Sequence, residues 1–392
     1  MTTTRAEPQP ADFADVRTTN LAVVLRHLRT HGPSSRAAIA ASTGLTKATV
    51  SSLTGDLIGH RLLRETGLSG NRIGRPATVL ALDGSAYASI GIQVGPDRLT
   101  ALAVDYSGDQ LLLWHRAVDR AARNASAITA LAQRAAGRVR QQGRHVLGLT
   151  VAVPGLVEEN GTVRLSPALG WSGLDLRAQV AGSLRSGDLA VSVANHAALA
   201  AVAEHRHGGH PEATLAYVSG AAGLEAGLIV DGRPLRGGRG YTGQLGRFTL
   251  GPAGTPSLQD NAGIEPLVRR ALPDFDPEAL ADLGPAVEQV AVRARAGDPG
   301  VLAALRHTGS YLGQGMALLV NLLSPEVIVL GDHFATLAEW LIPAAEAELN
   351  RHTSIRGTRI TASGLGLHAA ALGGAVSHLD QVDTGRIPRP LG

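Results

Sequence analysis

Hydrophobic positions near the start of the chain follow helical spacing, which predicts a helix that ends at the Gly-Pro pair 32–33. The side chains that share one face of this helix are Leu21, Val24, Leu25 and Leu28. A short helix over 36–42 and a longer helix over 47–59 are predicted next, with Gly44 at the turn between them. Helix, turn and helix at this spacing are typical of a helix-turn-helix.

The pattern then changes to extended segments over 62–66 and 75–82, on either side of a glycine-rich stretch at 67–74. Two extended segments around such a tip predict a β-hairpin wing. We therefore expect a winged helix-turn-helix of the α+β class over 17–83, preceded by a flexible N-terminus over 1–16.

Beyond residue 83 the pattern predicts strands alternating with helices, in the order of an actin-like, or ribonuclease-H-like, nucleotide-binding lobe. Strands are expected at 88–95, 99–105, 110–114, 146–153 and 190–193, and helices at 125–142 and 197–206. The order then recurs. We expect a first α/β lobe over 84–200, a second lobe with dimerisation helices over 201–365, a C-terminal helix over 366–380 that returns to the first lobe, and a tail over 381–392.

Composition favours a globular protein, because 44% of the 392 residues are hydrophobic and 18% are charged. No stretch approaches the ~18 apolar residues of a membrane span, and the N-terminus lacks the apolar segment of a signal peptide. We therefore expect a cytoplasmic protein with no membrane partner. The chain has no cysteine, which excludes disulfides, thiolate zinc ligands and cysteine nucleophiles.

Positive charge is concentrated in the predicted head. Residues 1–83 carry ten basic and six acidic residues, whereas the remainder carries 26 basic and 27 acidic residues. A basic module joined to a near-neutral body is typical of a nucleic-acid-binding domain attached to another domain. A solvated basic face or a three-helix protein-binding module is the alternative interpretation.

The short polar side chains on the second predicted helix suit hydrogen bonding to base edges in the major groove. The residues expected there are Lys47, Thr49, Ser51 and Ser52, with Arg36 and Thr46 near the DNA backbone. The wing tip carries Arg72 and Arg75, which are expected to enter the flanking minor groove.

Three blocks of sequence carry a resemblance to a known family. They are GLTVAVPGLVEENGTVRLSPALGW at 148–171, VANHAALAAVAEHRHG at 193–208 and YVSGAAGLEAGLIVDGRPLRGGRGYTGQLGR at 217–247. Together with the winged head, they resemble the ROK (repressor, open reading frame, kinase) family of transcriptional regulators over residues 17–378. That family covers sugar-responsive regulators and bacterial glucokinases.

The chain departs from the kinase pattern that this resemblance implies. Family kinases begin the first lobe with Asp-x-Gly, but the matching stretch here starts with Gln93, whose amide lacks a charged oxygen for Mg²⁺. Family kinases place their general base, an aspartate, directly after an asparagine, but Asn195 is followed here by His196. Losing such positioned charges commonly reduces phosphoryl transfer by orders of magnitude, so we expect no catalytic residues and no enzyme activity.

The sugar and zinc motifs are also altered. Sugar-binding members carry Glu-x-Gly-His where this chain has Gln244 and Arg247, and the three zinc-binding cysteines are missing from 251–258. We therefore expect no structural zinc and no cofactor. Three histidines between 205 and 210 are interpreted as a solvated helix end, so no metal ligand is expected.

The resemblance implies that Asn195, His196, Gln244 and Arg247 point into the cleft between the lobes. They form a neutral-to-cationic polar set, which suits a phosphorylated or otherwise anionic ligand, because arginine can bind phosphate bidentately. The alternative is that the cleft no longer binds a ligand and that the body serves as a dimerisation scaffold.

These features predict a DNA-binding transcriptional regulator, with repression the expected mode. A homodimer or tetramer would bind an inverted-repeat operator in double-stranded DNA, because two-fold protein symmetry requires two-fold operator symmetry. A sugar, sugar phosphate or other small effector would modulate it. The alternatives are an active ATP-dependent sugar kinase with a DNA-binding head and a regulator without an effector.

Overall fold

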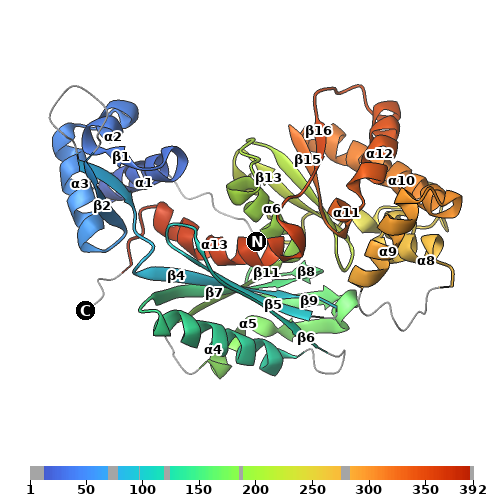
Figure 1. Ribbon diagram of the computed structural model, residues 1–392, viewed down its shortest axis with the longest axis horizontal. Coiled ribbons are helices and arrows are strands. Elements are labelled where there is room, and N and C mark those ends of the chain that lie inside the picture. The colour runs from blue at the N-terminus through green and yellow to red at the C-terminus, as the bar shows by residue number, and fades with distance from the viewer. Residues whose placement is uncertain are drawn as a thin grey trace, which may run out of the picture.

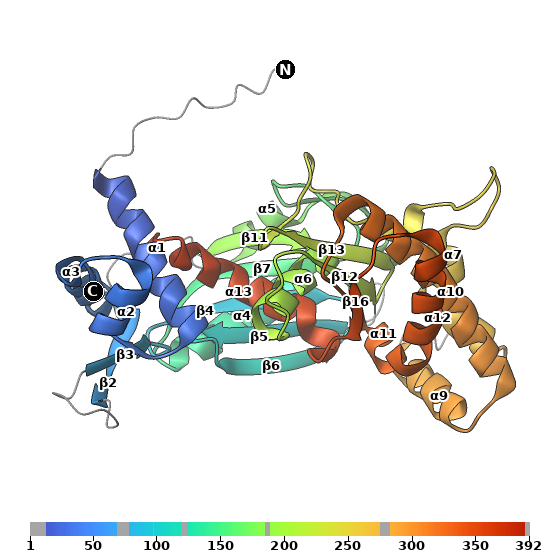
Figure 2. The same cartoon turned by 90° about the horizontal axis from the view of Figure 1, so that it is seen from above.

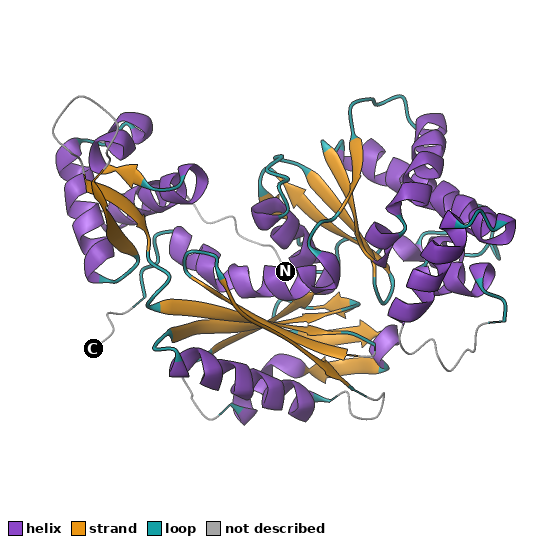
Figure 3. Cartoon of the chain, in the orientation of Figure 1, coloured by secondary structure: helices purple, strands orange, loops and turns teal. Residues whose placement is uncertain are grey.

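The computed structural model describes residues 13–68, 78–96, 98–118, 124–184, 189–274 and 283–388. A small head lies at one end of a two-lobed body, and the C-terminal helix lies along the first-lobe sheet with one end beside the head (Figures 1 and 2). Each lobe is a β-sheet with helices packed against it (Figure 3). Among the helices in these ranges, none is both long enough and apolar enough to cross a bilayer.

The head is a helix-turn-helix with a small antiparallel sheet, in the order β1-β3-β2. Its elements are α1 (Phe13–His31), β1 (Ser34–Ser35), α2 (Arg36–Thr43), α3 (Lys47–Gly59), β2 (Leu63–Leu68) and β3 (Thr78–Leu82). Ser35 and Thr46 cap α2 and α3 by accepting hydrogen bonds from Ala38 N and Thr49 N. Gly44 ends α2 with φ 75°, a left-handed conformation that glycine adopts at no steric cost. The wing tip lies outside the described residues.

The first lobe is built on a five-stranded sheet in the order β11-β7-β4-β5-β6. Its strands are β4 (Tyr87–Val94), β5 (Arg98–Asp105), β6 (Gln110–Ala117), β7 (His145–Val153) and β11 (Ala190–Asn195). The first three strands are antiparallel, and β7 and β11 run parallel to β4. Helix α4 (Ala125–Gln141) lies below the sheet and α13 (Ala369–Asp383) lies above it in Figure 1.

Between β7 and β11 the chain forms a small antiparallel sheet that the sequence pattern did not indicate. It consists of β8 (Leu156–Val157), β9 (Thr162–Ser166) and β10 (Trp171–Asp175), followed by α5 (Leu176–Ser183). The turn at 154–155, which precedes β8, reaches the second lobe, because Gly155 N donates to the Glu225 carboxylate over 2.9 Å.

The second lobe repeats the arrangement with a sheet in the order β14-β13-β12-β15-β16. Its strands are β12 (Leu215–Gly220), β13 (Leu224–Val230), β14 (Arg233–Pro234), β15 (Val327–Asp332) and β16 (Arg359–Ala362). Its helices are α7 (Leu258–Ala262), α8 (Ile264–Ala271), α9 (Leu283–Arg295), α10 (Pro299–Leu323), α11 (His333–Thr336) and α12 (Ala338–His352). Strand β16 and helix α12 were not predicted. The two lobes and the helix-turn-helix head confirm the expected fold class.

Helix α13 packs unusually closely on both sides. A Cβ atom added at Gly91 on β4 would lie 1.8 Å from the carbonyl oxygen of Ala371, and one added at Gly373 would lie 1.8 Å from that of Leu199. Leu199 belongs to α6 (His196–His207), which packs against the sheet of the second lobe. Glycine therefore allows α13 to pack directly against β4 on one side and α6 on the other.

A half-buried ion pair joins the head to the C-terminal end of α13. The Arg29 guanidinium on α1 donates through Nε and Nη2 to the Asp383 carboxylate over 2.9 and 3.1 Å. Its Nη1 donates to the carbonyl of Tyr106 over 3.0 Å, and the Tyr106 hydroxyl donates to Asp383 over 2.8 Å. One helix thus contacts the head, the first sheet and α6.

Candidate functional site

The polar residues predicted to contact DNA lie at the N-terminal end of α3. Lys47, Ser51 and Ser52 are exposed and Thr49 is half-buried. Thr46 is the helix cap, and its hydroxyl lies 2.8 Å from that of Thr49, so these two side chains are already hydrogen-bonded to each other. Thr46, Lys47, Ser51 and Ser52 are thus the exposed residues of the predicted contact surface, and the Thr46 hydroxyl is already hydrogen-bonded.

Arg36 has partners inside the head. Its Nε donates to Thr54 Oγ1 over 3.1 Å, and its Nη2 lies 3.0 Å from Glu65 Oε1. The guanidinium thereby links α2 to α3 and β2, so Arg36 helps to set the angle between the two helices. Arg72 and Arg75 lie outside the described residues.

A cavity of about 590 Å³ lies between the lobes. Its wall includes Pro154, Gly155, Ser166, Gly223, Glu225, Gln244, Arg247, Ser257, Gln259 and Glu265. The structure thus places Gln244 and Arg247 at one cavity, where the Arg247 Nε donates to Gln244 Oε1 over 3.4 Å. No motif of the sequence indicated Glu225 or Glu265.

Asn195 is not among the residues that line this cavity, but it is hydrogen-bonded to Glu225, which does line it. Its Nδ2 donates to the carbonyl of Gly155 and to Glu225 Oε2, both over 2.8 Å, while its Oδ1 accepts from Ala198 N and caps α6. Gln244 Nε2 also donates to Glu225, over 3.4 Å. Three uncharged groups, namely the Asn195 amide, the Gln244 amide and Gly155 N, therefore surround one carboxylate. Burial raises the pKa of Glu225, despite these donors and the nearby charge of His196.

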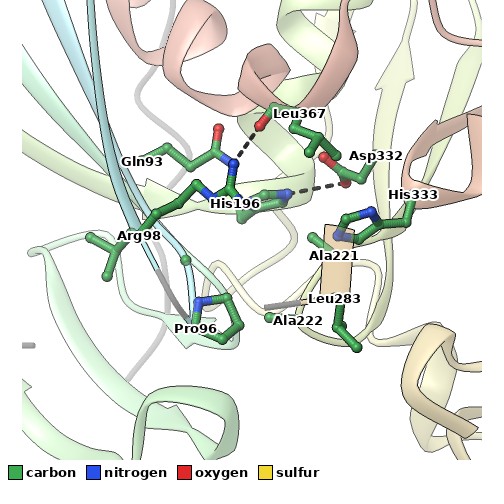
Figure 4. A pocket seen from close by; sticks show the side chains of 12 residues that line it. Gln93, Pro96, Arg98, His196, Ala221, Ala222, Leu283, Asp332, His333 and Leu367 are labelled. Carbon is green, nitrogen blue, oxygen red and sulfur yellow. Dashed lines mark hydrogen bonds and ion pairs between the residues drawn. The ribbon is translucent and has the colours of Figure 1, made fainter. Parts of the chain in front are cut away.

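His196 faces a different and much smaller cavity, of about 50 Å³ (Figure 4). Its Nε2 lies 3.2 Å from Asp332 Oδ2, which also accepts a hydrogen bond from Ser219 Oγ over 2.7 Å. Both members of the His196–Asp332 pair are buried, at 3% and 2% exposure. Asp332 ends β15, so the pair joins the first residue of α6 to the end of a second-lobe strand.

The predicted ligand residues are divided between two neighbouring cavities that share Ala222: Gln244 and Arg247 line the larger one, and His196 lines the smaller one. Glu225 and Glu265 add two carboxylates to the wall of the larger cavity, beside Arg247. The role of the four residues in ligand binding stays a prediction. A single sequence does not show that a carboxylate at the start of β13 and another on α8 line the same cavity.

Burial alone would lower the pKa of His196, but the charge and hydrogen bond of Asp332 outweigh it, so this pKa is raised above 6.5. Burial would likewise raise the pKa of Asp332, but the charge of His196 holds it below 3.8. The two shifts favour a charged pair. Such a pair is strongly destabilised when one partner is removed and the other is left buried.

We expect a pH-dependent cost for His196→Gln. The raised His196 pKa makes its contribution to stability complete below pH 6.5, and this contribution is lost as the pH rises through the folded-state pKa. The variant should therefore unfold about 3 kcal/mol more easily at the acidic end of this range, with a smaller difference at alkaline pH. Denaturant titrations from pH 6 to pH 9 measure this. Ser219→Ala, which removes a non-titrating partner of Asp332, should show a constant deficit; a constant deficit for His196→Gln would contradict a charged pair.

Gln93 uses both ends of its amide within the protein. Its Nε2 donates to the carbonyl of Leu367 over 2.9 Å, and its Oε1 accepts from Ala371 N over 3.2 Å. The side chain thus fixes the start of α13 against β4. An amide suits this position because it supplies one donor and one acceptor, whereas a carboxylate supplies only acceptors at neutral pH.

Hydrogen bonds within the segment 249–260 hold the region that corresponds to the zinc-binding motif implied by the resemblance. Ser257 and Asp260 form a capping box at the start of α7, and Thr249 pairs with Ser257 across the turn. Within the described ranges, no three side chains of the metal-binding types are grouped so that they could hold an ion.

The fold and the cavity define the class of the protein: a helix-turn-helix head, of the kind that binds DNA, is joined to a two-lobed α/β body with a cavity between the lobes. The comparisons give the family: residues 89–380 match the ROK family, and residues 18–67 match the IclR helix-turn-helix domain. The chain therefore belongs to the ROK family, which confirms the resemblance seen in the sequence, and its head is a helix-turn-helix of the IclR type.

Similar proteins span nearly the whole chain. The xylose repressor of Bacillus spizizenii is 26% identical over 372 residues, which cover 93% of this chain and 95% of that protein. The DNA-binding transcriptional dual regulator NagC of Escherichia coli is 24% identical over 350 residues, which cover 86% and 85%.

Among solved structures, a ROK family transcriptional regulator described as a homologue of the E. coli MLC protein superimposes with a TM-score of 0.76 at 23% identity, covering 95% of this chain and 98% of that one. A ROK family glucokinase from Streptomyces griseus superimposes with a TM-score of 0.62 at 24% identity, covering 74% and 98%. At identities below 25%, these two superpositions show a shared fold and do not assign a function.

Proposed function

We propose that this protein is a sequence-specific transcriptional regulator, in particular a repressor, that acts on the chromosome in the cytoplasm. The observation that carries the proposal is the basic helix-turn-helix head joined to a ROK body whose kinase positions are occupied by Gln93 and His196. The repressor relatives that cover both head and body support it. Two copies, as a homodimer or within a tetramer, would present two α3 helices to an inverted repeat.

Sequencing of the genomic DNA retained by the purified full-length protein tests this proposal. We expect enrichment of a small set of fragments that share an inverted repeat. The variant Ser51→Asp with Ser52→Asp adds negative charge at two exposed positions of α3, where it would repel phosphate, and should lose the enrichment. Equal enrichment with this variant, or retention without any shared sequence, would refute site-specific binding through α3.

A sugar kinase with a DNA-binding head is the rival from the enzyme class. A general base must have a free lone pair to accept a proton, whereas Asp332 raises the pKa of His196 and favours the charged imidazolium, which has none. Gln93 is engaged in holding α13. We propose that the body performs no phosphoryl transfer. A coupled assay with ATP, Mg²⁺ and a panel of hexoses tests this, and turnover that disappears with His196→Ala would establish the kinase instead.

We propose that a small ligand between the lobes controls the head. Closure of the cleft would move α6 and the strands against α13, and the Arg29–Asp383 pair connects α13 to the head. The control is limited by the ligand's difference in affinity for the two arrangements. Thermal-shift screening with sugars and sugar phosphates tests this step, and the absence of stabilisation by every member of the panel would favour a regulator without an effector.

A further inference from the structure

One carboxylate in the interlobe cavity has no cationic partner. Two carboxylates, Glu225 and Glu265, line the wall. Glu265 is paired, because the Arg269 guanidinium lies 2.8 Å from its Oε1. Within the described ranges no arginine or lysine pairs with Glu225, and the charge that acts on it comes from His196, which is bound to Asp332. A charge held away from water is expensive unless it is paired.

The partners of Glu225 leave room for one more donor. Its Oε1 accepts from Gly155 N and Gln244 Nε2, and its Oε2 accepts from Asn195 Nδ2. An ionised carboxylate offers about four lone-pair sites. One acceptor site therefore remains, on a side chain that is partly accessible and borders the cavity.

A second wall residue also lacks a partner. Ser166 lines the same cavity and is fully buried, and its Oγ has no hydrogen-bond partner. A hydroxyl group seldom stays buried without a partner, because the free energy of its desolvation is then not offset by a hydrogen bond. A ligand hydroxyl at this wall would supply the missing bond.

These observations distinguish between kinds of ligand. An anionic ligand would meet two carboxylates and one arginine, and that arginine is exposed and bonded to Gln244. A divalent cation would need about six oxygen ligands, and most of the lone pairs of Glu225 are already taken by protein donors. A primary ammonium group needs only an open acceptor and an opposite charge.

We propose that Glu225 binds the ammonium group of a small polyhydroxylated amine, such as an amino sugar, with Ser166 bonding one of its hydroxyl groups. The cavity volume of about 590 Å³ lies within the usual range for small-molecule sites. The inference rests on the proposed regulatory role of the cleft and specifies the chemical class of its ligand. Glu225 is then a specificity-determining residue, because it discriminates an amine from the matching alcohol.

Calorimetric titration of the full-length protein with matched sugars tests the inference. The probes are D-glucosamine, D-galactosamine and D-mannosamine, each compared with its parent hexose and its N-acetyl derivative, at a pH where the amines are protonated. We expect at least one amine to bind ten-fold or more tightly than both uncharged partners. Glu225→Gln should abolish this preference, whereas Glu346→Gln, which removes an exposed charge from α12, should retain it.

Two results would overturn the inference: binding of an uncharged hexose as tightly as its amine, or failure of every amine to bind. Because Glu225→Gln could disturb the contact with Gly155 N, Glu225→Ala is measured as well, and both variants are checked by melting without ligand and by operator binding. Persistence of the amine preference in either folded variant would also refute it. Operator binding reports on the proposed function separately, so each idea can fail without the other.

Discussion

Gly373→Ala is expected to destabilise the body by about 3 kcal/mol or more, which would be seen as a large fall in the midpoint of thermal unfolding. The new methyl group would lie 1.8 Å from the carbonyl oxygen of Leu199 on α6. A backbone carbonyl inside a helix cannot rotate away as a flexible side chain can. Helix α13 would therefore have to separate from α6, and the contact between the C-terminal helix and the second lobe would be lost.

Gly137→Ala on α4 is the matched control. It makes the same change in a helix, but at a position where an added Cβ meets no atom within 4 Å. Alanine is favoured over glycine inside a helix, so this variant should be more stable by up to about 1 kcal/mol. An unchanged midpoint for Gly373→Ala would show that α13 and α6 are not in direct contact.

The sequence predicted the head better than the body. In the head, the caps, the turn glycine and the apolar face all concern residues within one helical turn of each other, so local patterns were enough to place α2 and α3. The sequence also predicted that the two strands of the wing form a hairpin, and in the structure β2 pairs with β3 in antiparallel register. Strand β16 was missed because it is a four-residue edge strand whose place in the sheet depends on parallel pairing with β15, where Arg359 pairs with Val327. That pairing leaves no local signal.

The candidate site was harder to predict than the fold, because its residues meet through contacts between distant parts of the chain. Asn195, Gln244 and Arg247 were found because they stand at motif positions. The structure places the amides of Asn195 and Gln244 at one carboxylate, with Arg247 bonded to Gln244. Glu225 falls in a strand that the pattern predicts over 223–231, directly after a glycine-rich turn, and no motif marked it as a ligand residue. His196 was identified correctly as a departure from the kinase motif, but its partner Asp332 lies 136 residues away. Only the packing of β15 beside β12 brings them together.

The described head also clarifies which residues remain for DNA recognition. Because Thr46 and Thr49 bond each other and Arg36 is bound to Glu65 and Thr54, α3 offers few free side chains. Affinity must then depend strongly on cationic groups elsewhere in the head. The sequence places two arginines, Arg72 and Arg75, in the segment that connects β2 to β3.

Arg72→Ala combined with Arg75→Ala is expected to weaken operator binding about a hundredfold or more. An arginine contact to DNA contributes about 1–3 kcal/mol, and a tenfold change in affinity corresponds to about 1.4 kcal/mol. Arginines that enter a narrow minor groove also release counterions, so the dependence of log affinity on log salt should become shallower. Gel-shift titrations at four or more salt concentrations give both quantities.

The matched control for this wing variant is Arg138→Ala combined with Arg236→Ala, which removes the same charge from two exposed positions of the body. If the wing reads the minor groove, the control should keep both affinity and salt slope. A loss common to both variants would point to the net charge of the chain instead, because long-range attraction does not depend on where the charge sits. Full affinity in the wing variant would assign recognition to α3 alone, which its few free side chains make difficult.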